Sequence, residues 1–219
     1  MRRVIMRAYL ALVLLAAAGA CVTSATPEGE PAAHNVRERL AQPTRLYIAP
    51  GTSTGEIMAS RYTHDGWVSG TTPLTVNTGE LHAVVDNDGK IAVTGLEIAV
   101  NDIAIPEDVF GKPANLTNVK VSLPYASLAS VVWNGDDDAM LSMSLALDLD
   151  WDLAANGAVS PLGTQHLPPI NVTTEVTGDG QHVDASLALD ATGDLWSWAD
   201  LFKLTELKLD LAAATVDAN

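Results

Sequence analysis

The stretch Met140–Leu153 reads MLSMSLALDLDWDL and decides the fold expected for this chain. From Leu141 to Leu153 every odd position carries a large apolar side chain, and the even positions between them carry Ser, Ala or Asp. A period of two places all the apolar groups on one face of an extended strand, whereas a helix would scatter them around its axis. The pattern predicts one long strand over this range, with its odd residues buried and its even residues in water.

Shorter segments with similar alternation lie on both sides of this stretch, and glycine-containing turns separate some of them. Asp86-Asn87-Asp88-Gly89 and Gly178-Asp179-Gly180 read as hairpin turns, because Asp-Gly is a strong turn signal. Leu195–Phe202 reads either as a short helix or as a strand end, and Asn35–Ala41 as two helical turns that stop before Pro43. Leu46–Val76 has no clear pattern. The further predicted strands are Leu81–Val85, Lys90–Val100, Leu116–Leu123, Leu128–Trp133, Ile170–Val176, His182–Ala191 and Leu204–Ala212.

Strands joined by tight turns, with few helices to make crossovers, predict a mainly β fold built as an antiparallel meander. About eight to ten such strands would form a curved sheet, either barrel-like or a two-layer sandwich, with at most one or two short helices. Clean alternation indicates that one face of the sheet meets water. Residues 35–219 are expected to form a single β-rich domain.

The N-terminus has the pattern of a secretory signal peptide. Arg2, Arg3 and Arg7 precede an uncharged apolar run, and small residues follow it. The end of this segment, Ala18-Gly19-Ala20-Cys21, resembles the signal of bacterial lipoproteins, with Ala18 where that family usually has Leu. The resemblance implies a signal peptide over residues 1–20 and acylation of Cys21, the only cysteine in the chain.

Residues 21–34 read as a flexible tether, since they are rich in small residues, Gly and Pro. By the same resemblance, Val22 after the cysteine, rather than Asp, implies the outer membrane of the cell envelope. The expected partner is therefore the lipid bilayer, reached through the acylated Cys21, because two or more acyl chains give firm binding.

The chain is strongly acidic. Removing residues 1–20 takes away three arginines and no acid, so the formal charge goes from −15 to −18. Such a surface disfavours nucleic acid, whose phosphates need Lys and Arg, and it keeps a domain dispersed in water. A single cysteine excludes an internal disulfide, so the core alone must stabilise the domain.

Two groups of residues are candidate sites. Asp148, Asp150 and Asp152 share a strand face and are weak candidates for calcium, although a charged outer face that blocks edge pairing explains them as well. Trp151, Trp196 and Trp198 are candidates for a ligand platform or for core filling, and Trp67 and Trp133 are further candidates.

Two motifs of metal and redox sites are missing from the sequence: there is no HExxH and no Cys-x-x-Cys. We therefore expect a protein without enzymatic activity or cofactor. The leading hypothesis is a module that holds an apolar or lipid ligand against the aliphatic sheet face. The alternative is a structural or protein-interaction role in the cell envelope.

The first prediction concerns the anchor. Replacing Cys21 by Ser removes the thiol that the acyl chains need, so the variant should be unprocessed or should stay in the aqueous phase of a detergent partition. The native chain should enter the detergent phase and show added acyl mass by mass spectrometry. A native chain that stays in water without that mass would contradict the assignment.

Overall fold

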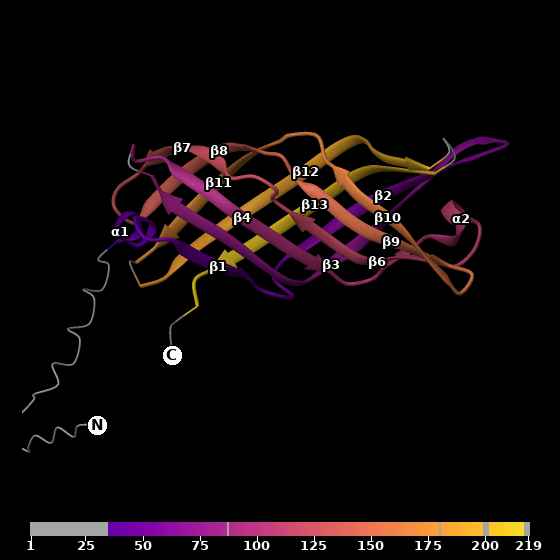
Figure 1. The fold of residues 1–219 in the computed structure, drawn as a ribbon, viewed down its shortest axis with the longest axis horizontal. Helices are drawn as coiled ribbons and strands as arrows, with labels where there is room; N and C mark the ends of the chain where they lie inside the picture. Colours follow the sequence, from indigo (N-terminus) through magenta and orange to yellow (C-terminus); the bar gives the residue numbers. More distant parts are fainter. Residues whose placement is uncertain (1–34, 87, 180, 199–201, 217–219) are drawn as a thin grey trace, which may run out of the picture. The chain divides into compact units, whose positions relative to one another are not determined.

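A computed structural model describes residues 35–86, 88–179, 181–198 and 202–216. The predicted signal peptide, Cys21 and the tether lie outside these residues. The described chain forms one antiparallel sheet of thirteen strands with two short helices, α1 (Val36–Leu40) and α2 (Glu107–Phe110), which confirms the mainly β class (Figure 1). The strands are β1 (Thr44–Ile48), β2 (Thr54–Thr63), β3 (Gly66–Val85), β4 (Ile91–Val100), β5 (Ile103–Ile105), β6 (Ala114–Ser122), β7 (Ser127–Trp133), β8 (Asp138–Leu145), β9 (Asp148–Ala155), β10 (Ala158–His166), β11 (Ile170–Gly178), β12 (Val183–Trp198) and β13 (Phe202–Ala214).

At the end of the sheet that carries α1, the strands close into a ring. β1 lies between β3 and β13, with Leu46 opposite Leu81 and Tyr47 opposite Ala214. From β3 the pairing continues through β4, β7, β8, β11 and β12 and returns to β13. The alternatives left open by the sequence are thereby resolved: the sheet is barrel-like at this end, and its two walls belong to one continuous sheet.

The decisive stretch Met140–Leu153 forms two strands, so the prediction of one strand is wrong in that detail. β8 ends at Leu145 and pairs with β7 and β11, whereas β9 starts at Asp148 and pairs with β6 and β10. The chain stays extended where it changes partners, and the burial period of two runs through the break. The odd residues from Leu141 to Trp151 are buried, and Leu153 is half-buried.

Several strands were not predicted. Leu46–Val76 contains the end of β1, all of β2 and about the first half of β3, where many Thr, Ser and Gly residues hide the alternation. β10 includes Pro161 and is exposed on both faces, so it has no apolar period to detect. Leu195–Phe202 contains the end of β12, which resolves that segment as strand up to Trp198.

The two hairpin turns have the expected local chemistry. The Asp86 carboxylate accepts hydrogen bonds from the backbone N–H groups of Asp88 and Lys90, at 2.9 and 2.8 Å. Asp179 accepts from the N–H groups of Gln181 and His182 in the same way, and these bonds lower the pKa of its carboxyl. The predicted first helix is present as α1, where the side chain of Asn35 caps the N–H of Glu38.

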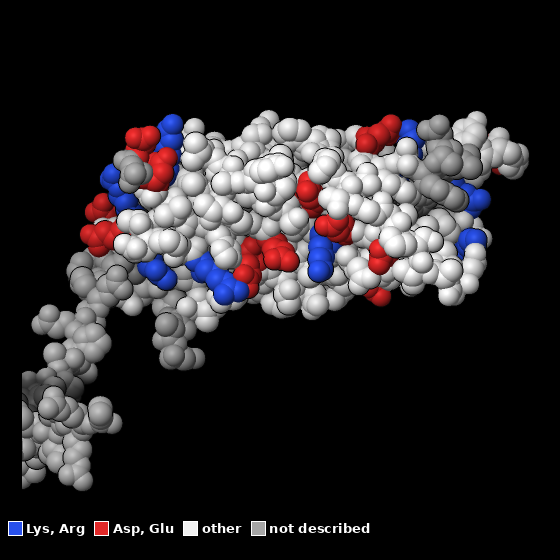
Figure 2. All heavy atoms as spheres, viewed as in Figure 1, with Lys and Arg blue, Asp and Glu red and all other residues white. Residues whose placement is uncertain are grey.

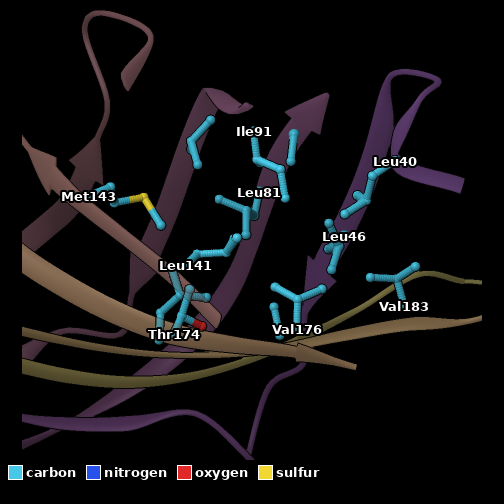
Figure 3. Close-up of a pocket in the computed structure, with 13 residues that line it drawn as sticks. Leu40, Leu46, Leu81, Ile91, Leu141, Met143, Thr174, Val176 and Val183 are labelled. Atoms are coloured by element: carbon cyan, nitrogen blue, oxygen red, sulfur yellow. The ribbon is translucent and has the colours of Figure 1, made fainter. Parts of the chain in front are cut away.

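The core is continuous and lies inside the ring. Side chains from opposite walls of the sheet point toward one another there, among them Leu46, Leu81 and Leu141 (Figure 3). The free space between them is about 20 Å³, which is on the order of one water molecule. The aliphatic face is thus covered by the sheet itself, and the space between these side chains is too small for an alkyl ligand.

All residues of this core lie between Val36 and Ala213, so a chain that begins at Val22 keeps the core whole. Within the described residues, no helix has the length and apolar character needed to cross a bilayer.

The second prediction tests the two faces of the decisive stretch. Leu147 is 1% exposed at the junction of β8 and β9, so Leu147→Ala should lower the free energy of unfolding by about 2–5 kcal/mol. The matched change Asp150→Ala, on the outer face, should cost less than about 1 kcal/mol. Urea unfolding of both variants measures the difference, and equal losses would contradict the two-faced assignment.

Candidate functional site: an aromatic cleft at the open end of the sheet

Toward the end that carries α2, the sheet does not close. Within the described residues, β12 pairs with β11 only over Val183–Ser186, and from Leu187 onward its edge away from β13 has no strand partner. On the other side β10 pairs with β9 alone. Two free strand edges, those of β10 and β12, therefore bound an opening in the wall of the sheet.

A cleft of about 420 Å³ lies at this opening. Its volume falls within the range of roughly 300–1,000 Å³ that is usual for small-molecule sites. Residues from β2, β9, β10, β12, β13 and the α2 region line it: Arg61, Phe110, Lys112, Leu153, Ala155, Asn156, Ser160, Leu162, Trp196 and Phe202.

Aromatic rings in edge-to-face contact form one wall of the cleft. Phe202 lies edge-to-face with Phe110 at 5.5 Å and with Trp196 at 5.9 Å between ring centroids. Trp151 stands behind Trp196 at 5.6 Å, and is 2% exposed. Edge-to-face geometry at these distances is favourable for aromatic pairs. These rings form an apolar wall, and Leu153 and Leu162 extend the apolar lining.

The structure places the predicted tryptophans differently from one another. Trp151 belongs to the core, and its buried indole N–H meets no acceptor in the described residues. Trp196 is half-buried and lines the cleft. The backbone of Trp198 pairs with Phe202, but its side chain lies outside the described residues. Trp67 is 46% exposed beside Tyr62, away from the cleft lining, and Trp133 lies under Arg37.

Arg61 brings a positive charge to the inner face of the sheet. It follows Ile57 and Ala59 on the same face of β2, both of which are buried, and its partner across the strands is Phe202. The Arg61 guanidinium donates to the carbonyl oxygen of Phe110, at the C-terminus of α2. This bond fastens the helix to the mouth of the cleft and leaves other guanidinium N–H groups free to donate.

Lys112 supplies a second positive charge at the same place. Its Nζ lies 5.9 Å from the centroid of the Phe110 ring, a weak cation–π contact. Neither Lys112 nor Arg61 forms an ion pair with a carboxylate among the described residues, and the cleft lining contains no acidic side chain.

Some other cations of the domain have carboxylate partners. Arg45 hydrogen bonds to Glu80 and lowers the pKa of that carboxyl, while Glu206 and Glu56 flank Lys208 and raise the pKa of its ammonium group. Figure 2 shows the same mixture over one face, where acidic and basic groups lie side by side. Arg61 and Lys112 have no such partner among the described residues, and both line the same cleft.

The aspartates considered for calcium do share the outer face of β9, but each has a different neighbour. Asp148 lies 2.6 Å from Nδ1 of His166, Asp150 accepts from the Thr164 hydroxyl, and Asp152 accepts from the Asn118 amide at 2.7 Å. Within the described residues, no three His, Cys, Asp or Glu side chains converge to hold a metal ion. These carboxylates thus link β9 to its neighbours.

The sequence reasoning missed Arg61, Phe110, Lys112 and Phe202. The dipeptide Asn156-Gly157 was an available signal, because Asn-Gly is the preferred tight hairpin turn, and both residues have positive φ, 54° and 75°. It would have revealed β10 and one side of the cleft. No pattern marked Arg61, whose segment was left unassigned.

Comparisons with known proteins add little to this geometry. No family model matches the chain, and no curated protein matches it. Two crystal structures of Ail, the attachment invasion locus protein of Yersinia pestis, align with 79% of this chain and 99% of theirs at 9% identity. Their TM-scores are 0.38 and, for the complex with the heparin analogue sucrose octasulfate, 0.36. Similarity at this level supports no inference about the present chain.

The third prediction tests how the α2 region is held. Gly111 has φ +79°, and an added Cβ would meet Nη1 of Arg61 at 2.3 Å, whereas Gly157, at φ +75°, has open space. Both alanine substitutions carry backbone strain. Gly111→Ala should cost about 1–3 kcal/mol more than Gly157→Ala, because it also displaces a charged hydrogen bond. Urea unfolding measures both, and the excess should vanish in an Arg61→Ala background.

Proposed function

We propose that this protein is a lipid-anchored component of the cell envelope, at the outer membrane, whose β domain binds an apolar or lipid ligand without transforming it. The aromatic cleft between β10 and β12 supports this proposal. It combines an apolar wall with a few polar groups near its mouth, which is the usual make-up of a small-molecule site.

The ligand class follows from the shape and chemistry of the lining. An alkyl chain gains about 0.8 kcal/mol for each methylene that it buries. Ten buried methylenes would give about 8 kcal/mol, and several kcal/mol of this are lost to restricted motion. The resulting affinity is expected in the range of about 0.1–1 mM.

Attachment to the membrane is proposed to run through Cys21 rather than through the sheet. Strands that cross a bilayer turn apolar side chains to the lipid. The outer face of these strands instead carries groups such as Asp148 on β9, Thr173 on β11 and Asp184 on β12, while most of their aliphatic side chains point inward. A domain with this outer face is suited to an acyl anchor on a tether.

A binding role fits the cleft better than a catalytic one. The ten lining residues include no carboxylate, no histidine and no thiol. General acid–base catalysis relies chiefly on these groups. The polar lining groups, Asn156 and Ser160 beside the two cations, are suited to orienting a ligand.

One observation favours the alternative hypothesis, a protein-interaction role. Leu128, Val132 and Met140 are 58%, 63% and 37% exposed on the outer face of β7 and β8, and Val132 lies directly opposite Met140. This exposed apolar strip is separate from the cleft. It becomes the better candidate if the cleft proves not to bind amphiphiles.

The fourth prediction tests the cleft with a neutral ligand. Titration of the chain from Val22 with 1-decanol should change tryptophan fluorescence in a saturable way. Trp196→Ala should weaken binding about tenfold, since it removes one aromatic surface of the site. Trp67→Ala removes an exposed tryptophan outside the cleft and should leave the affinity unchanged.

Calorimetry of the same titrations and urea unfolding of both variants separate loss of binding from loss of fold. Absence of saturable binding up to the solubility of decanol, in a native chain that is fully folded, would overturn the proposal.

A further inference from the structure

The cleft has a polar end as well as an apolar wall. Arg61 and Lys112 both lie beside Phe110, one bonded to its carbonyl oxygen and the other near its ring. Asn156 and Ser160 add an amide and a hydroxyl to the lining. The hydrocarbon surfaces of Trp196, Phe202 and Leu162 occupy the rest. The charged and apolar parts of the lining are thus both present in one cleft.

The cleft lining is positively charged, whereas the chain as a whole is acidic. Acids outnumber bases by 27 to 12 over the sequence, yet among the described residues two bases and no acid line this cleft. Two other surface hollows do not share this excess of positive charge: one mixes Arg45 and Lys120 with Glu80 and Glu97, and another holds Glu175 and Asp184.

The unused hydrogen-bond donors of the two cations point to an anionic ligand. The Arg61 guanidinium has N–H groups left after bonding to Phe110, and Lys112 is exposed with no carboxylate partner in the described residues. A guanidinium with an ammonium nearby binds the oxygens of carboxylates and phosphates well. A neutral ligand would leave the half-buried Arg61 guanidinium without a counter-charge.

We infer that the cleft is selective for an anionic amphiphile, a single alkyl chain with a carboxylate or phosphate head group. The chain lies along Trp196 and Phe202, and the head group contacts Arg61 and Lys112. This inference rests on the proposed function, because it assigns the polar half of the same site.

The test compares ligands of equal chain length that differ in head group: decanoate, decyl phosphate, 1-decanol and decyltrimethylammonium, each below its micelle concentration at pH 8. Tryptophan fluorescence and calorimetry on the chain from Val22 give the affinities. Decanoate or decyl phosphate should bind at least about tenfold more tightly than 1-decanol, and the cationic ligand more weakly than 1-decanol. The carboxylate and phosphate arms identify the preferred anion.

Variants assign the selectivity to the two cations. Lys112→Gln should reduce the preference for the anion severalfold and leave decanol binding unchanged, and Lys112→Glu should reduce it further. Lys90→Gln, which removes the same charge from the β3–β4 turn outside the cleft lining, is the matched control. Arg61→Gln should also reduce the preference, and urea unfolding shows whether it keeps its fold; the exposed Lys112 decides the question if it does not.

The outcomes separate the two proposals. Equal affinities for the anionic, neutral and cationic ligands would overturn the charge selectivity and leave the apolar site standing. Anion preference that survives in Lys112→Gln and in a folded Arg61→Gln would also overturn the assignment. Failure of all four ligands to bind would overturn the site itself.

Discussion

The need to cover one aliphatic sheet face governs this structure. Few residues form helices, so no separate layer is available to pack on the leucine-rich side of the strands. The sheet meets the requirement by curling until its own walls face each other, with β1 joining β3 to β13. Ring closure therefore provides the core, and the proposed binding site lies where the wall of the sheet opens.

The open end arises because strands change partners along their length. β1 and β2 lie one after the other between β3 and β13, and β8 and β9 follow each other with different neighbours. Each change of partner alters which strands are neighbours along the sheet. At the open end, β10 and β12 are not paired with each other. The aromatic residues at this opening, chiefly Phe202 and Trp196, maintain packing where backbone hydrogen bonds stop. A candidate site thus follows directly from the topology.

Local sequence patterns predicted much of the fold. The alternation around Leu145 and the turns at Asp86 and Asp179 predicted β structure and hairpins, because these signals depend on residues close in sequence. The closure of the ring and the division of Met140–Leu153 depend on which distant strands pair, and alternation does not encode this. The cleft was inaccessible for the same reason: Arg61, Lys112 and Trp196 are far apart in sequence and meet only through the sheet.

The pairing of Tyr47 with Ala214 also constrains the order in which the molecule can form. The first strand is fixed in place partly by the last, so the ring cannot close until nearly the whole chain is available. For a chain predicted to leave the cytoplasm behind a signal peptide, late closure keeps the translocating polypeptide extended. Its long apolar strands are then exposed until the C-terminal strand arrives, and the acidic side chains that alternate with them oppose association between copies during that interval.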